Sequence, residues 1–81
     1  MPHIVVKLYP GRTEDQKQKL TKAIAKNVVE IAGCEDSHVS VVFEETTPEA
    51  WPEEVYRPDI LEMKKGKLYK KPGYNPFETN E

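Results

Sequence analysis

Two short runs of β-branched residues, separated by one long helical segment, constrain the fold of this sequence more than any other feature. Residues 3–8 read HIVVKL and residues 39–44 read VSVVFE, so apolar residues recur at every second position of both runs, as on half-buried strands. Parallel strands need a long crossover connection, whereas antiparallel strands can be joined by a hairpin. The order therefore predicts a right-handed β-α-β unit with parallel strands.

The segment between these runs carries signals for both ends of a helix. Thr13 and Gln16 have the spacing of a capping box, and Gly33 suits the left-handed position that follows a helix. Val29 falls on the side opposite the apolar stripe, where it is a candidate contact for a partner. The stripe that is predicted to face the sheet consists of Leu20, Ala23, Ile24, Val28 and Ile31.

The chain is too short to bury a large core. It has 81 residues and a single cysteine, Cys34, so no disulfide within the chain can compensate for the small core. Two strands and one helix are marginal on their own in water. We therefore predict a homodimer, in which two units align edge to edge and complete a four-stranded sheet.

The last part of the chain is less regular. Residues 47–51 have a threonine at a helix N-cap followed by a proline, and residues 58–65 carry a second helical pattern. The predicted domain covers residues 1–81, with a core of residues 1–51, an extension of residues 52–74 and a disordered tail of residues 75–81.

Charge and hydropathy argue against several classes of protein. The formal net charge of −2 provides no positive field for nucleic acid, and the lysines within residues 64–71 fit a solvated helix end. No apolar run approaches the ~20 residues of a membrane span, and the N-terminus lacks the apolar core of a signal peptide. Histidines and acidic residues lack the spacing of a metal site. We expect a cytoplasmic protein with no membrane, nucleic-acid or metal partner.

Two residues near the N-terminus call for a functional explanation. Pro2 directly follows Met1, just before the first predicted strand. It lies two residues before Ile4, so its ring is expected to point to the same face of the sheet as Ile4. Arg12 precedes the helix start, where the helix dipole favours anions over cations. Together they indicate an active site built around a chain terminus. His3 and His38 are interpreted as surface or interface residues.

The order and spacing of these residues resemble the 4-oxalocrotonate tautomerase family. The similarity runs from Pro2 through the GRT of residues 11–13, the amphipathic helix and the strand ending in Glu44, to Trp51. The KKPGY of residues 70–74 is similar to the PptA-type bacterial subgroup, which has an extra C-terminal helix. The resemblance implies an α/β (α+β) fold: the β-α-β tautomerase fold with a short C-terminal helical extension, whose sheet is completed by dimerisation.

The resemblance also implies a mechanism that needs no cofactor. Family members lose the initiator methionine, and the exposed proline nitrogen acts as general base between carbon and oxygen. A free α-amino group titrates near ~7.7–8.0 in peptides, and a nearby cation and partial burial lower that pKa. Pro2 is thus the predicted catalytic base of a keto-enol tautomerase, working near the operating pH.

The same resemblance implies the substrate-binding residues. Arg12 is expected to bind a substrate carboxylate, and Trp51 stands where the family has an aromatic residue in the pocket wall. Ser40 stands where the best-known members carry a second arginine, so it is a candidate substrate-binding position that lacks the usual cation. One arginine and one tryptophan predict monocarboxylate enols, such as phenylenolpyruvate, as substrates.

Three alternatives remain open at this stage. Related sites hydrate, dehalogenate or decarboxylate small acids, but these reactions need further polar groups to activate water, and the sequence offers no convincing set. A non-catalytic module on the same scaffold is favoured by the serine at position 40. A hexamer is possible, although the C-terminal segment favours a dimer because it can cap surfaces that shorter relatives use for assembly.

Overall fold

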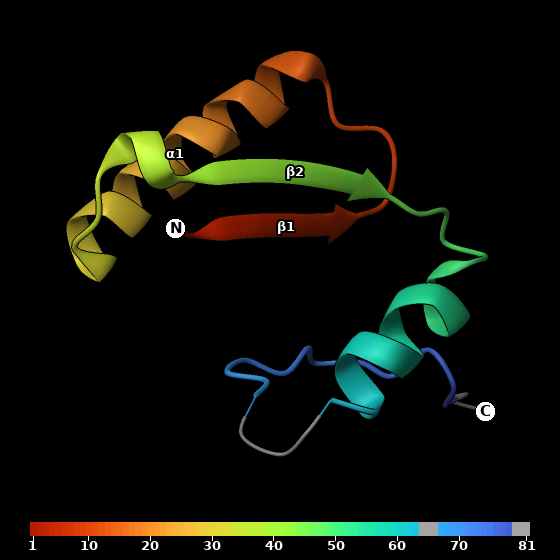
Figure 1. Ribbon diagram of the computed structural model, residues 1–81. Coiled ribbons are helices and arrows are strands. Elements are labelled where there is room, and N and C mark those ends of the chain that lie inside the picture. Colours follow the sequence, from red (N-terminus) through yellow and green to blue (C-terminus); the bar gives the residue numbers. More distant parts are fainter. Residues whose placement is uncertain (64–66, 79–81) are drawn as a thin grey trace. The chain divides into compact units, whose positions relative to one another are not determined.

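A computed structural model describes residues 1–63 and 67–78, and the chain divides into two compact units. The first unit is Met1–Glu45 and the second begins at Thr46. The predicted division into a core of residues 1–51 and an extension of residues 52–74 stays a prediction. The elements, labelled in Figure 1 where there is room, are β1 (His3–Leu8), α1 (Glu14–Ala32), the short 3₁₀ turn η1 (Asp36–His38), β2 (Ser40–Glu45) and the helix η2 (Pro52–Leu61).

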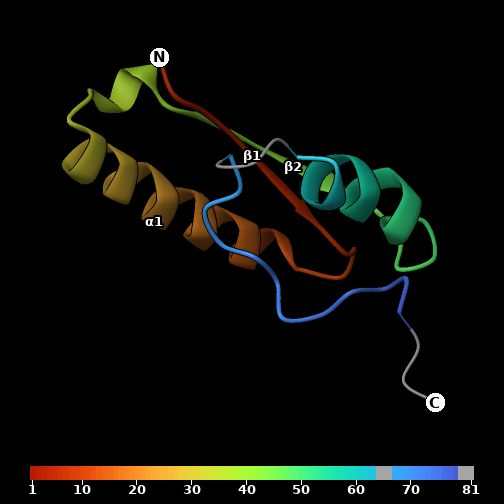
Figure 2. The same cartoon turned by 90° about the horizontal axis from the view of Figure 1, so that it is seen from below.

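The first unit is a parallel β-α-β motif, as predicted. β1 and β2 pair from His3 opposite Ser40 to Leu8 opposite Glu45. α1 runs back along one side of the pair, in the direction opposite to the strands (Figures 1 and 2). β2 begins one residue later than predicted, because the amide of Val39 closes the η1 turn by donating to the carbonyl of Asp36 at 3.1 Å.

Both ends of α1 form as the sequence predicts. The Thr13 hydroxyl accepts from the amide of Gln16 at 3.1 Å, and the Gln16 side chain accepts from the amide of Thr13 at 2.8 Å. At the other end, Gly33 adopts a φ of 73° and donates to the carbonyl of Val29 at 3.1 Å. These contacts satisfy backbone groups that a helix end leaves free.

The buried face of α1 is rotated from the predicted one. Leu20 is 42% exposed and Ile31 84%, and Ala23 is exposed as well, so these three side chains lie outside the helix–sheet contact. Val29, predicted to lie opposite the buried stripe, is half-buried. The two strands leave part of the apolar arc of the helix uncovered. The half-buried side chains of α1 are Lys17, Thr21, Ile24, Ala25, Val28 and Val29.

Among the residues that the structure describes, buried side chains occur only in the second unit. They are Val55 and Tyr56, each 5% exposed, and both belong to η2. The inward side chains of β1 and β2 are no more than half-buried. The first unit therefore has a complete backbone ladder and an incomplete core.

The helix of the second unit starts earlier than the sequence predicts. The Thr47 hydroxyl accepts from the amide of Ala50 at 3.3 Å, so Thr47 caps a turn at residues 48–50. The helix η2, whose own N-cap is Trp51, follows this turn and runs through Pro52–Leu61 with Pro58 inside it, instead of starting at Pro58. Its turns are wide, and the amide of Glu62 reaches the carbonyl of Arg57, five residues back. A proline in a regular α-helix clashes with the preceding turn, and a helix with this wider winding accommodates it.

The segment after η2 packs against Tyr56. The Tyr56 hydroxyl donates to the carbonyl of Tyr74 at 3.0 Å, and the rings of Tyr56 and Phe77 lie 6.0 Å apart in an edge-on arrangement. The amide of Phe77 also donates to the Asn75 side chain at 2.9 Å. The predicted disordered tail of residues 75–81 stays a prediction, and residues 79–81 lie outside the described part.

Candidate active site

Pro2 lies half-buried at the head of β1, on the same side of the sheet as Ile4. Its carbonyl accepts a hydrogen bond from the amide of Ser40 at 3.1 Å. Met1 in front of it is 91% exposed. Removal of Met1 would therefore leave a proline nitrogen that is anchored through its own carbonyl and reachable from solvent.

Ser40 lies beside Pro2, but its side chain points to the other face of the sheet. Ser40 pairs with His3, and side chains alternate along a strand, so both project away from the Pro2 side. The Ser40 Oγ lies 2.6 Å from Nδ1 of His3. Sequence reasoning missed this pair, although the parallel register would have shown that the two residues start their strands side by side.

Arg12 lies at the opposite end of β1 from Pro2. Gly11, with a φ of 122°, turns the chain after the strand, and Arg12 follows it as an exposed residue before Thr13. β1 has six residues, which at ~3.3 Å per residue span about 20 Å. A small enol acid cannot bridge this distance. The structure therefore does not bring Arg12 and Pro2 of one chain together.

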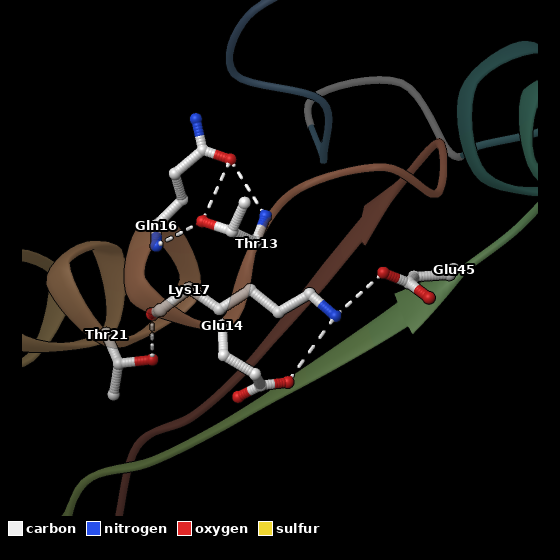
Figure 3. A network of polar contacts seen from close by, with 6 residues as sticks. All are labelled: Thr13, Glu14, Gln16, Lys17, Thr21 and Glu45. Atoms are coloured by element: carbon white, nitrogen blue, oxygen red, sulfur yellow. Dashed lines mark hydrogen bonds and ion pairs between the residues drawn. The ribbon is translucent and has the colours of Figure 1, made fainter.

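An ion-pair network joins α1 to the end of β2 near Arg12. The Lys17 ammonium lies 2.7 Å from Glu45 and 4.0 Å from Glu14 (Figure 3). The hydrogen bond with Glu45 raises the pKa of Lys17 above its ordinary value. The carbonyl of Lys17 also accepts from the Thr21 hydroxyl at 2.8 Å. Lys17 is thus engaged by carboxylates and holds the helix start, together with the Arg12 segment, against the sheet.

The second unit contains Trp51 and the other arginine of the chain. Trp51 is half-buried at the start of the helix, and its role in a pocket wall stays a prediction. Arg57 donates from Nε and Nη2 to the carboxylate of Glu53 at 2.8 and 2.9 Å, and it lies 4.4 Å from the centre of the Phe77 ring. The hydrogen bonds lower the pKa of Glu53 and raise that of Arg57. Arg57 therefore already has a carboxylate partner.

A groove of about 520 Å³ runs between α1 and β2, on the first unit. Its apolar lining includes Ala25, Val29, Val39 and Val41, and its rim is charged. None of Pro2, Arg12 and Ser40 lines it.

Neither a group of possible metal ligands nor a helix that is long and apolar enough to cross a membrane occurs within residues 1–63 and 67–78.

Comparison with known families identifies the class of protein to which this β-α-β unit belongs. The family described as Tautomerase enzyme matches residues 2–55, from the candidate base to the second unit. The chain belongs to this tautomerase family and is a tautomerase, an intramolecular isomerase.

Bacterial relatives match over nearly the whole chain. A probable tautomerase of Xylella fastidiosa is 40% identical over 79 residues, which are 98% of this chain and 95% of the relative. The tautomerase PptA of Pectobacterium carotovorum subsp. carotovorum is 38% identical over 76 residues, which are 93% of this chain and 99% of the relative. The predicted resemblance to the PptA-type subgroup is confirmed.

Solved structures confirm the fold. TomN, a 4-oxalocrotonate tautomerase homologue of the tomaymycin biosynthetic pathway, superposes with a TM-score of 0.60 at 36% identity, over 62% of this chain and 77% of TomN. YwhB, another 4-oxalocrotonate tautomerase homologue, gives a TM-score of 0.56 at 33% identity, over 57% of this chain and 75% of YwhB. The predicted tautomerase fold is therefore correct.

Proposed function

We propose that this chain is a cofactor-independent keto-enol tautomerase of small 2-oxo acids, with the nitrogen of Pro2 as general base after removal of Met1. The observation that carries the proposal is the position of Pro2 at the half-buried head of β1, beside an exposed Met1. Behind Met1 the nitrogen is an amide without basicity. Once Met1 is removed, it becomes a secondary amine that can take up and return a proton at neutral pH.

The reaction balances with this one group. The neutral amine of Pro2 takes the proton of the enol hydroxyl, and the oxygen forms a carbonyl as the carbon–carbon double bond moves its electrons to the adjacent carbon. The resulting ammonium gives a proton to that carbon and returns to the neutral amine. No electrons leave the substrate, so no redox cofactor is required.

The second part of the proposal is that a homodimer completes the site. Arg12 is too far from its own Pro2, and no described side chain of the first unit is fully buried. β1 and β2 form a two-stranded sheet, so each has an edge available for a further strand. Antiparallel pairing across a two-fold axis would bring the Arg12 end of one protomer to the Pro2 end of the other. A hexamer would satisfy the same geometry.

The third part is a preference for substrates with one carboxylate. Ser40 supplies no cation, and Arg57 is held by Glu53. Arg12 of the partner subunit would bind the carboxylate, and Trp51 would line the apolar end. A lost charge-assisted contact corresponds to about tenfold or more in affinity. We therefore expect phenylenolpyruvate to be turned over at least about tenfold more efficiently than 2-hydroxymuconate.

A cytoplasmic location is proposed on the state of the cysteine. Cys34 is a free thiol, half-buried, with its sulfur 3.8 Å from the carbonyl of Val28. A free cysteine fits a reducing compartment. Fractionation of cells that produce the protein should recover it with cytoplasmic markers, and recovery with periplasmic or extracellular markers would contradict the assignment.

The deciding experiment compares two forms of the same chain. One form is shown by intact mass to lack Met1, and the other keeps it. Only the first should convert phenylenolpyruvate, because an amide nitrogen cannot act as the base, and circular dichroism should be the same for both. Undiminished activity in the form that keeps Met1 would refute the mechanism.

A further inference from the structure

We propose that His3 and Ser40 form a positioning pair, which holds the head of β1 so that the Pro2 nitrogen keeps its catalytic orientation. The proposal rests on the proposed role of Pro2 as general base. It also gives Ser40 a role other than contact with substrate. Three residues lie together at one end of the sheet: Pro2, His3 and Ser40.

Pro2 has a single backbone anchor to the sheet. A proline nitrogen donates no ladder hydrogen bond while it is an amide, so the link between Pro2 and β2 is the carbonyl that accepts from the amide of Ser40 at 3.1 Å. Chain ends fray unless they are tied down. The orientation of the Pro2 nitrogen therefore depends on how firmly Ser40 is placed.

Ser40 is itself tied to the next residue of β1. Its Oγ lies 2.6 Å from Nδ1 of His3, a short hydrogen bond between the first residues of the two strands. Ser40 thus holds two consecutive residues, Pro2 through its amide and His3, the first residue of β1, through its hydroxyl. Two bonds to neighbouring residues restrict the strand end more than either bond alone.

The pair acts through the backbone and does not touch the reacting atoms. His3 and Ser40 project from the face of the sheet opposite to the ring of Pro2, and the Ser40 hydroxyl is already occupied by His3. The hydroxyl can donate to a neutral imidazole nitrogen or accept from a protonated one, so the bond is compatible with either form of the ring. This arrangement assigns His3 and Ser40 a positioning role.

The expected effect is on turnover. A reacting group displaced by about 1 Å can lose ~10²-fold in rate, and a strand end that is only loosened samples such positions part of the time. Loss of one hydrogen bond corresponds to about threefold to tenfold in rate. We therefore expect kcat to fall by that factor and KM to stay nearly constant, because the pair does not contact substrate.

The test uses variants that differ by a single group. Ser40→Thr keeps the hydroxyl. Ser40→Val has the same shape as Ser40→Thr, with a methyl group in place of the hydroxyl. His3→Asn keeps a polar group near the position of Nδ1, whereas His3→Leu removes it. With Met1 removal verified by mass, Ser40→Thr and His3→Asn should retain most of kcat on phenylenolpyruvate, and Ser40→Val and His3→Leu should each lose about threefold to tenfold.

Two further variants sharpen the comparison. The double variant His3→Leu/Ser40→Val should be no worse than either single variant, since both remove the same bond. Val42→Thr, on the same strand and the same face as Ser40, should leave kcat within about twofold, because surface substitutions away from such features have small effects.

A readout without substrate separates this proposal from the proposed function. Hydrogen exchange of the amide at position 40, which donates to Pro2, should be at least about threefold faster in Ser40→Val than in Ser40→Thr. Equal exchange, or equal kcat in the two variants, would overturn the proposal. A raised KM with unchanged kcat would overturn it too, in favour of direct substrate contact. Inactive wild-type enzyme would refute the proposed function, while the exchange rates would still decide whether the pair holds the strand.

Discussion

The two units of this chain obtain their order in opposite ways. The first unit, Met1–Glu45, has a regular parallel ladder and a capped helix, but none of its described side chains is fully buried. The second unit has a wide, proline-containing helix and holds the buried Val55 and Tyr56. Regular hydrogen bonding and a closed core are thus separate properties. A unit that has regular hydrogen bonding but no closed core is suited to completion by a partner.

The largest expected effect of a substitution is at Tyr56, in the core of the second unit. Replacing a buried aromatic residue by alanine costs about 3–5 kcal/mol, so Tyr56→Ala should unfold the second unit or lower its free energy of unfolding by that amount. The fluorescence of Trp51, the single tryptophan of the chain, reports this unit in urea titrations. The amide signals of β1 and β2 should persist.

A milder variant serves as the control for Tyr56. Tyr56→Phe keeps the ring contacts with Tyr74 and Phe77 and removes only the hydroxyl that donates to Tyr74. It should cost about 1 kcal/mol. An unchanged Trp51 transition in Tyr56→Ala would show that this residue does not form the core of the second unit.

The next largest effect is expected on the activity of Arg12→Ala, in the first unit. Arg12 is exposed and makes no contact with its own Pro2, so Arg12→Ala should leave the stability of the monomeric unit nearly unchanged. It should lower kcat/KM by about tenfold to a hundredfold, because a charge-assisted contact with the substrate carboxylate is lost. Steady-state kinetics on phenylenolpyruvate, together with thermal unfolding, measure both quantities.

Mixed dimers show whether Arg12 acts across the subunit interface. Arg12→Ala protein should keep at most about a tenth of the wild-type activity, and a form blocked at Pro2 by Met1 should be nearly inactive. When mixed in equal amounts and allowed to exchange, they should recover about a quarter of the wild-type activity, since half of the dimers have one intact site. No recovery, in dimers shown to exchange, would place both residues in a site within one chain.

The smallest effects are opposite pH dependences of the two units. The hydrogen bonds from Arg57 lower the pKa of Glu53 in the folded second unit. This contribution is present above the ordinary value of 4.5 and is lost as the pH falls through the lowered value. The hydrogen bond with Glu45 raises the pKa of Lys17 in the first unit, so that contribution is present below 10.5 and is lost as the pH rises through the raised value.

Melting curves at a series of pH values test these signs. Acid should lower the midpoint reported by Trp51, and Glu53→Gln should reduce that dependence. Base should weaken the contact between α1 and β2 in the first unit, and Glu45→Gln should reduce that second dependence. The changes should be small because surface ion pairs contribute little. If acid lowers the melting midpoint of Glu53→Gln as much as that of the wild type, other carboxylates cause the dependence.

The sequence by itself determined the strand–helix–strand order, the ends of α1 and the family. The capping box of Thr13 and Gln16 and the left-handed Gly33 depend on contacts within about four residues, so local spacing is sufficient to predict them. The position of Pro2 behind Met1 is likewise a property of the sequence alone. The roles of Pro2, Arg12 and Trp51 in the site stay predictions.

Only the tertiary structure decided which groups meet. The hydrogen bond between His3 and Ser40 joins residues that are 37 positions apart, and it depends on the register of two strands. The buried face of α1 depends on how the helix lies on the sheet, which leaves Ile31 exposed and Val29 half-buried. The separation of Arg12 from Pro2 follows from the direction of β1. Local patterns contain none of this information, because it arises from how distant segments pack.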